Sequence, residues 1–391
     1  MARKLDITAI PEGWKYDLLD NFAERCSGHT PSKSRPEYWN GGIKWISLTD
    51  SYRLDKGYVY ATDKEISQEG INNSSAELHP VETVVLTRDA GIGKSGVMAE
   101  AMAVSQHFIA WRCDNKEKLN SWFLYYWLQL NKTEFERQAV GSTIKTIGLP
   151  YFKKLMIAVP PYLEQEKIAQ ILSTWDKAIA ITEQLLINSQ RQKKALMQQL
   201  LTGKKRFSEF KGGWKCVELG SLLEYTQPTP YLVKSTDYND DYETPVLTAG
   251  KTFILGYTNE AEGIYNDKLP VIIFDDFTTD SKFVDFPFKA KSSAMKILTS
   301  RDGVSIKYVF EAMQILDFTI GGHQRHWISI FSNLKIALPE LAEQQKIASV
   351  LSTADSEIKT LKTQLECLEQ EKKALMQQLL IGKRRVQTET A

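Results

Sequence analysis

The chain has 391 residues, 42% hydrophobic and 25% charged, and no apolar run approaches the roughly 18 residues needed to cross a bilayer, so we expect a soluble protein without a membrane partner. Neither a signal-peptide core nor Cys-x-x-Cys spacing is present, which argues against secretion, a disulfide framework and a zinc cluster and favours the cytoplasm. The net charge of +1 is weak for a nucleic-acid binder, so such a function requires local basic clusters or charge from a partner.

The first predicted domain, residues 1–156, combines loops, short strands and helices. Gly, Pro and Ser punctuate Gly28–Asp50, which is typical of loops and short strands. Val81–Thr87 predicts a buried strand. Ser121–Leu130 predicts a helix whose aromatic stripe we interpret as core.

A long helix is predicted within residues 157–206. It opens at Pro160-Pro161 and ends at Gly203 before a basic cluster, which are helix start and stop signals. Apolar residues alternate at spacings of four and three, the seam of a coiled coil, with polar breaks at Thr182, Ser189 and Lys193. The seam residues are Ile168, Leu172, Trp175, Ile179, Leu186, Leu196 and Leu200.

The second predicted domain, residues 207–335, has strand-like runs at Pro245–Leu247, Val271–Phe274 and Ile328–Phe331. The acidic run Asp237–Glu243 would repel phosphate, and we interpret it as a solvated edge. Both domains therefore predict mixed α/β folds with Gly-rich loops.

Residues 336–385 repeat residues 157–206 without a gap, and 26 of the 50 positions are identical. Weak repeats lie upstream: Gly13-Trp14-Lys15 matches Gly213-Trp214-Lys215, and Trp122–Tyr126 matches Lys307–Glu311. The second helix opens at Pro339, ends at Gly382 and precedes a tail at 386–391. Its seam residues are Ile347, Leu351, Ile358, Leu361, Leu365, Leu368, Leu375 and Leu379.

An amphipathic helix of about 38 residues, roughly 57 Å long, cannot bury its own seam. Two such helices in one chain can pair with each other. The domain between them can bring the chain back, so that the second helix runs antiparallel to the first. The predicted fold class is α+β: two mixed α/β domains joined by two long helices that form an antiparallel intramolecular coiled coil with pseudo-two-fold symmetry. A parallel intermolecular coiled coil is the alternative.

Residues able to read DNA gather in a few loops of each domain. Arg and Lys contact phosphate and guanine, Gln and Asn read adenine, and Ser and Thr serve either role; ordinary solvated loops are the alternative for any single residue. The candidates in the first domain are Thr30, Ser32, Lys33, Arg35, Arg88, Lys94, Ser142, Thr143 and Lys145. Those in the second are Gln227, Thr229, Lys251, Lys289, Lys291, Ser292, His323, Arg325 and His326.

Four segments resemble enzyme motifs, and none completes one. Ala90–Ser95 resembles a phosphate-binding P-loop but has Arg88 where the first Gly is required. Val159-Pro160-Pro161-Tyr162 lacks the Asn or Asp that holds the target amine in DNA amino-methyltransferases. Asp275, Asp276, Asp280 and Lys282 resemble a nuclease cluster but fit a polar turn, and His323-x-x-His326 lacks a third metal ligand. We therefore predict no catalytic and no metal site.

The repeat resembles the conserved spacers of type I restriction-modification specificity subunits. Glu164–Arg206, with its Ala195–Gly203 ending, is similar to the central spacer, and Glu343–Arg385 to the distal one. Gly28–Ile46 resembles the opening of one class of target-recognition domain. Pro245–Lys251 and Lys289–Met295 resemble another class.

The resemblance implies a non-catalytic subunit. Each domain would read one half of a bipartite, asymmetric site on double-stranded DNA, and the helices would fix the gap between the halves. Two modification subunits would dock on the helices, bring S-adenosylmethionine and methylate adenine, and restriction subunits would add ATP- and Mg-dependent translocation and cleavage. This chain would hold no cofactor. A coiled-coil scaffold and a stand-alone DNA-modifying enzyme are the alternatives.

Overall fold

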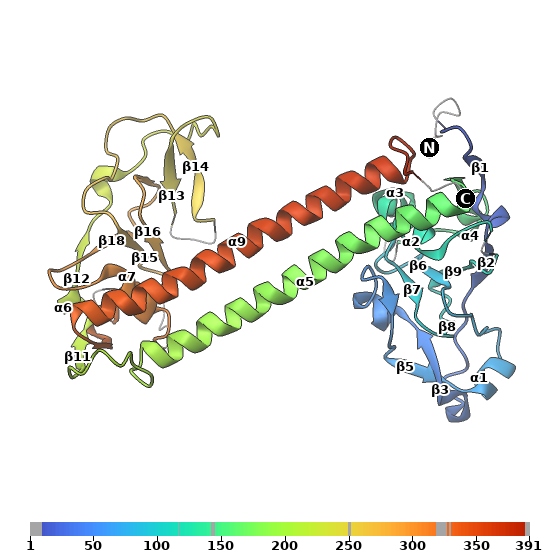
Figure 1. The fold of residues 1–391 in the computed structure, drawn as a ribbon, viewed down its shortest axis with the longest axis horizontal. Coiled ribbons are helices and arrows are strands. Elements are labelled where there is room, and N and C mark those ends of the chain that lie inside the picture. Colours follow the sequence, from blue (N-terminus) through green and yellow to red (C-terminus); the bar gives the residue numbers. More distant parts are fainter. Residues whose placement is uncertain are drawn as a thin grey trace. The chain divides into compact units, whose positions relative to one another are not determined.

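Two long helices, α5 (Tyr162–Leu200) and α9 (Leu341–Leu379), run through both units into which the chain divides (Figure 1). The computed structural model describes residues 10–115, 117–141, 145–248, 252–317, 327 and 330–387. Unit 1 comprises Met1–Thr182 with Gln364–Ala391, and unit 2 comprises Glu183–Thr363. Each unit thus holds one half of each long helix, and the predicted domain boundaries stay a prediction. Across the described ranges, no helix is long and apolar enough to cross a membrane.

The part of each unit outside the long helices is called its head: it precedes α5 in unit 1 and lies between α5 and α9 in unit 2. The head of unit 1 has a five-stranded sheet in the order β2-β9-β6-β7-β4, a three-stranded sheet β5-β3-β8 and the ladder β1-β10. Helix α2 packs against β6 and β7 and buries its aromatic side chains in the main core of this unit. The strands are β1 (Lys15–Leu18), β2 (Glu24–Ser27), β3 (Trp39–Ile46), β4 (Tyr58–Val59), β5 (Lys64–Ile66), β6 (Val84–Thr87), β7 (Ser95–Met98), β8 (Ala103–Val104), β9 (Phe108–Arg112) and β10 (Met156–Val159). The helices are α1 (Gln68–Asn72), α2 (Ser121–Leu130), α3 (Lys132–Gln138) and α4 (Leu149–Phe152).

The head of unit 2 has a four-stranded sheet β12-β18-β15-β16, a three-stranded sheet β14-β13-β17 and the ladder β11-β19. Helix α7 packs against β15 and β16. The strands are β11 (Lys215–Glu218), β12 (Leu223–Thr226), β13 (Thr244–Leu247), β14 (Ile254–Thr258), β15 (Val271–Asp275), β16 (Ser281–Val284), β17 (Lys289–Ala290), β18 (Met295–Ser300) and β19 (Lys335–Leu338). The helices are α6 (Leu219–Leu222) and α7 (Ile306–Met313).

The two heads share one topology, although their sequences look unrelated outside the repeat. In the larger sheets, antiparallel pairs β2·β9, β9·β6 and β6·β7 correspond to β12·β18, β18·β15 and β15·β16. In the smaller sheets, β3 pairs antiparallel with β5 and parallel with β8, just as β13 pairs with β14 and β17. The duplication therefore includes the heads, and the turn between β6 and β7 corresponds to the turn between β15 and β16, although β4 has no counterpart among the described strands of unit 2.

The predicted elements compare closely with the observed ones, with two exceptions. The helix over Ser121–Leu130 and its role in the core are confirmed. Of the buried strand predicted over Val81–Thr87, only Val84–Thr87 forms β6, and Val81 lies in a turn with 51% of its surface exposed. The other two apolar runs lie in β13 and β15. The strand predicted over Ile328–Phe331 is wrong in its described part, because Phe331 begins a 3-10 helix and packs in the core against Phe274, with ring centroids 4.8 Å apart and the rings tilted by 55°. A short apolar run suits either structure.

Both long helices have the predicted ends and seams. Gly203 and Gly382 follow the helices with φ of 69° and 70°, a left-handed conformation that glycine adopts without a steric penalty. The chain then turns back, and the N–H groups of Lys205 and Arg384 each donate to a carbonyl six residues earlier. Every predicted seam residue is buried or partly buried.

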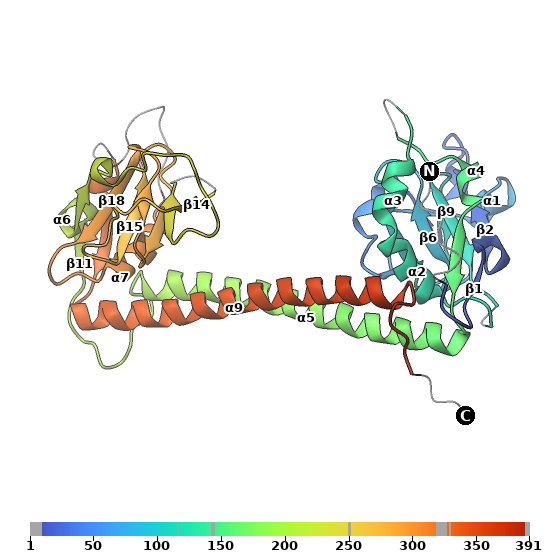
Figure 2. The same cartoon turned by 90° about the horizontal axis from the view of Figure 1, so that it is seen from above.

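The helices pair in an antiparallel direction within each unit. In unit 1, where the ribbons of α5 and α9 run antiparallel (Figures 1 and 2), the carboxylate of Glu164 near the start of α5 accepts two hydrogen bonds from Arg385 beyond the end of α9. Farther along α5, Asp176 pairs with Lys372. In unit 2 the same bonds recur with the copies exchanged, as Arg206 to Glu343 and Lys193 to Asp355. The predicted antiparallel intramolecular pairing is confirmed, and the parallel alternative is wrong.

The repeated Glu-Gln pair attaches each head to its helix. Glu164 also accepts the indole N–H of Trp14 (3.3 Å), and Glu343 accepts that of Trp214 (3.0 Å), which explains the weak upstream repeat. Gln165 accepts the backbone N–H of Asn120, the residue that caps α2, at 2.7 Å. In unit 2, Gln344 does the same for Ser305, the cap of α7, at 2.9 Å. The same two side chains therefore fix the start of the helix and the head in both units.

A second junction differs between the units. In unit 1, the Tyr126 hydroxyl donates to Asp176 (2.6 Å), which also pairs with Lys372. In unit 2, Glu311 occupies the position of Tyr126. Its carboxylate, fully buried, lies 3.1 Å from Lys193 Nζ and 2.8 Å from Lys307 Nζ, and both lysines also contact Asp355. The extra negative charge of unit 2 is thus matched by an extra cation.

Candidate nucleic-acid interface

The turn between β6 and β7 forms one wall of a basic hollow on unit 1. The hydroxyl of Thr87 donates to the carbonyl of Gly91 (2.7 Å) and accepts the N–H of Lys94 (3.1 Å), which closes the turn. Gly91 and Gly93 adopt φ of 96° and 82°. The hollow has a volume of about 570 Å³, and three of its lining residues are lysines. The full lining is Ala90, Gly91, Ile92, Lys94, Lys132, Glu136 and Lys145.

Three separate segments bring these cations together. Lys94 Nζ donates to the carbonyl of Ser51 at 3.2 Å, Lys132 forms an ion pair with Asp55 at 2.7 Å, and Lys145 is exposed. The Lys145 segment is tied to the turn because the N–H of Ile147 donates to the carbonyl of Arg88 (2.8 Å). Lys94 and Lys132 are therefore held in place by side-chain contacts, and the backbone that carries Lys145 is fixed beside them, an arrangement suited to contacts with a phosphate backbone.

This turn corresponds to the segment that resembles a P-loop. Strand β7 begins at Ser95, immediately after the turn, whereas a P-loop leads into a helix whose N-terminus binds phosphate. The structure therefore gives a β-hairpin turn in place of a nucleotide site. Lys132 was not predicted as a site residue. It lies at the start of α3, far in sequence from the β6–β7 turn, and no local pattern marks it.

A second hollow of unit 1, of about 320 Å³, is lined by Lys33, Trp39, Asn40 and Lys64. Only Lys33 was predicted; Trp39 and Asn40 lie in β3 and Lys64 in β5. The neighbouring candidates have local partners: the Thr30 hydroxyl bonds Gln106, Ser32 bonds Ser34, and Arg35 forms an exposed ion pair with Glu37 (3.6 Å). Pairs between exposed groups contribute little free energy, so these side chains can exchange their local partners for DNA at a small cost.

In unit 2 the described candidates divide into exposed and buried residues. Gln227, Thr229 and Ser292 are exposed, and Lys291 Nζ lies 5.6 Å from the centre of the Tyr238 ring. Lys289 is different: its side chain is 1% exposed.

Lys289 serves the fold of the head. Its Nζ lies 3.0 Å from Glu260 and bonds the carbonyl of Glu262. Burial raises the pKa of Glu260, but hydrogen bonds from Ser235, Lys289 and Lys234 outweigh it and hold that pKa below its usual value. A lysine occupied in this way is not free to reach DNA, so we leave Lys289 out of the interface.

The remaining candidates, Ser142, Thr143, Lys251, His323, Arg325 and His326, lie outside the described residues.

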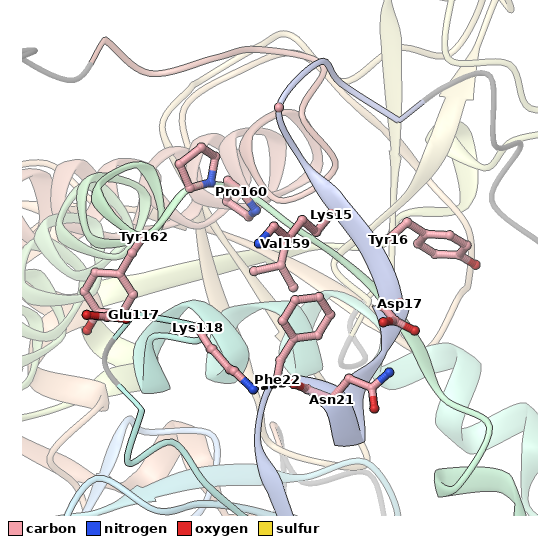
Figure 3. Close-up of a pocket in the computed structure, with 12 residues that line it drawn as sticks. Lys15, Tyr16, Asp17, Asn21, Phe22, Glu117, Lys118, Val159, Pro160 and Tyr162 are labelled. Atoms are coloured by element: carbon pink, nitrogen blue, oxygen red, sulfur yellow. Dashed lines mark hydrogen bonds between the residues drawn. The ribbon is translucent and has the colours of Figure 1, made fainter.

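A third hollow of unit 1, of about 660 Å³, lies where β1 and β10 lead into α5 (Figure 3). Figure 3 shows Lys118 extended toward Asn21, whose carbonyl it contacts at 3.3 Å, with Phe22 beside them. Val159 pairs with Lys15 in the β1–β10 ladder and is almost fully buried. A valine in a strand stands at the position where an amino-methyltransferase requires a carbonyl side chain before its two prolines.

Comparison with known proteins follows the same two-fold division. The family model described as "Type I restriction modification DNA specificity domain" matches residues 11–188 and again 211–370. A specificity subunit of the Escherichia coli type I restriction enzyme EcoR124I/EcoR124II is 55% identical, over 34% of this chain and 36% of that protein. A putative MjaX specificity subunit of Methanocaldococcus jannaschii is 24% identical, over 99% of this chain and 97% of that protein.

A solved structure has the same fold. The S subunit of a type I restriction-modification system from M. genitalium superposes with a TM-score of 0.67, at 15% identity, over 95% of this chain and 96% of that one. The match with the E. coli specificity subunit covers only about a third of the length of that protein. The two family matches together cover most of the chain and coincide with the two heads and their helices. The chain belongs to the family of type I restriction-modification DNA specificity subunits.

Proposed function

We propose that this chain selects the DNA sequence on which a type I restriction-modification enzyme acts. Each head reads one half of a split site, and the paired helices hold the heads and their partner subunits. The observation that carries this proposal is that two heads of one topology have different side chains at equivalent turns, while the helical repeats share 26 of 50 positions and the same contacts to the heads. Such a chain is built for two different readings on one scaffold. The family favours this role over a coiled-coil scaffold or a stand-alone enzyme.

The partners follow from the same proposal. Modification subunits bring S-adenosylmethionine and the catalytic residues, and restriction subunits bring ATP- and Mg-dependent cleavage, so the complex acts on DNA in the cytoplasm. One solved relative with a TM-score of 0.55 comes from work on complex assembly of the type I system, according to its description. The nearly neutral charge of this chain fits a complex whose other subunits supply part of the phosphate contact.

Helix α5 has a surface suited to such a partner. Ile181 and Leu185, one turn apart on the same face of α5, are 61% and 49% exposed, whereas the equivalent positions of α9 carry Thr360 and Gln364. Exposed apolar side chains on one helix copy alone favour a contact that only that copy makes. We propose that a modification subunit covers this part of α5.

The test is modified-base sequencing of DNA from cells that express the chain with its modification subunits and lack other adenine methylation. We expect a split motif with methyladenine in both halves, absent when this chain is deleted. Replacing the first head by that of another family member should change one half of the motif only. Methylation without a split motif would contradict the proposal, and so would a change in both halves after exchange of one head.

A further inference from the structure

The turn between β15 and β16 presents an aromatic side chain to solvent on unit 2. Phe277 is 50% exposed and is the one phenylalanine among the exposed large hydrophobic residues of the described chain, although burial would stabilise its ring. It follows directly on Asp275 and Asp276, which are both buried. The sequence pattern predicts a polar turn here and assigns no role to Phe277.

Two buried carboxylates hold this turn in place. Asp275 accepts the N–H groups of Phe277 (2.8 Å) and Thr278 (3.3 Å). Asp276 accepts the N–H of Trp327 (2.9 Å) and lies 3.5 Å from Lys296 Nζ, which is itself buried. The backbone beneath Phe277 is therefore rigid, and little conformational entropy is lost when its ring meets a ligand.

The counterpart of this turn in unit 1 is the turn of the basic hollow, since β15·β16 corresponds to β6·β7. There the exposed tip consists of Ala90 and Gly91, and the cations Arg88 and Lys94 flank it. On the proposed function, two heads that derive from one duplication present equivalent surfaces to the same DNA. The turn that carries cations in one head and a phenylalanine in the other would then face DNA in both.

The chemistry of the second turn favours bases over phosphates. Phe277 is uncharged, and the exposed Asp280 close by repels phosphate. An aromatic ring contacts DNA bases through stacking, insertion at a base step or contact with a thymine methyl group.

We propose that Phe277 is a specificity-determining residue that contacts a base of the half-site read by the head of unit 2. This inference rests on the proposed function and deepens it: the two heads read DNA by different chemistry at equivalent turns. The Arg88–Lys94 turn supplies cations and backbone N–H groups, whereas the β15–β16 turn supplies an apolar ring. Base–aromatic contacts typically change affinity from about fivefold to about 150-fold.

The experiment uses the complex of the full chain with its modification subunits. Affinity for the cognate site, and for sites with each base changed in turn, is measured for the unaltered chain and for Phe277→Ala, Phe277→Trp and Leu255→Ala. Leu255 is 39% exposed on β14 of the same head and serves as the matched control. A probe with 2-aminopurine in the second half-site reports unstacking, and a thymine-to-uracil series reports loss of a methyl contact.

We expect Phe277→Ala to weaken cognate binding by at least about fivefold and to lose discrimination at one position of the second half-site. The Trp variant should retain most of that discrimination, and Leu255→Ala should match the unaltered chain. A signal in either base-analogue series supports the inference and names the contact. Unchanged discrimination in Phe277→Ala overturns it, as does an equal loss on both half-sites and on non-cognate DNA. If the unaltered complex reads no split site, the proposed function fails, and this inference fails with it.

Discussion

Lys193 and Lys372 occupy equivalent positions of the repeat, yet we expect their replacement by methionine to have unequal costs. Lys193 Nζ lies 3.1 Å from the carboxylate of Glu311, which is fully buried, and 2.6 Å from Asp355. Its removal leaves Glu311 with Lys307 as its one remaining ion-pair partner among the described residues. Breaking a buried ion pair typically costs about 3 to 5 kcal/mol, and because Lys307 remains we expect the lower end, about 3 kcal/mol.

Lys372 faces a different environment. Its partner Asp176 is 37% exposed and keeps the hydrogen bond from Tyr126, so its carboxylate stays solvated and partnered. Ion pairs this exposed contribute up to about 1 kcal/mol. For units of this size, 1 kcal/mol corresponds to roughly 2 to 4 °C in Tm. We therefore expect Lys193→Met to lower the Tm of unit 2 by about 6 to 12 °C, and Lys372→Met to lower that of unit 1 by at most about 4 °C.

Calorimetry of the full-length chain measures both transitions in one experiment. The double variant Lys193→Met with Glu311→Gln removes the stranded charge and should recover part of the loss, which a double-mutant cycle quantifies. Equal shifts for the two lysine variants would refute the reasoning, since they would mean that the burial of Glu311 does not set the cost.

Three further predictions address acidity, partners and spacing. Burial, together with the charge of Arg112, lowers the pKa of His79 to about 4, so this side chain is neutral in the folded protein at neutral pH. Because the unfolded chain then binds a proton that the folded one does not, unit 1 should lose stability as pH falls from about 6.5 to 4. His79→Gln should reduce this pH dependence, which calorimetry at pH 7.5 and 5 measures. Leu185→Glu should weaken binding of a modification subunit by roughly tenfold or more in titration calorimetry, whereas Gln364→Glu at the equivalent position of α9 should not. Insertion of one heptad at equivalent points of both helices should lengthen the gap of the methylated motif by about 10 Å, or about three base pairs; an unchanged gap would contradict a spacing role of the helices.

The long helices could be predicted from the sequence because their signals are local. Pro160 and Gly203 mark the ends of α5, and the four-three spacing marks its buried face without any knowledge of the partner. The antiparallel direction could be predicted because the domain between the two helices can bring the chain back. The sequence left an intermolecular coiled coil open, and the contacts of Glu164 and Glu343 decide against it.

The heads resisted prediction because their structure depends on contacts between distant residues. Strands such as β4 and β8 have two residues each and carry no period. Lys289 was a candidate DNA contact because it precedes Lys291 and Ser292 in the same loop-like stretch, but burial against Glu260 decides its role. The basic hollow joins Lys94, Lys132 and Lys145, whose proximity only the folded chain reveals.

The junction at Tyr126 and Glu311 has a consequence for the inheritance of new specificities. In each unit, the helices offer one lysine and one aspartate, and the head supplies either a neutral hydroxyl or a carboxylate accompanied by its own lysine. A recombination event that moves a whole head carries the Trp122–Tyr126 or Lys307–Glu311 combination with it and leaves the charge balanced. A crossover between the first and the last residue of either segment would leave a single unpaired charge against the helices. Natural exchanges of recognition should therefore have their breakpoints outside α2 and α7.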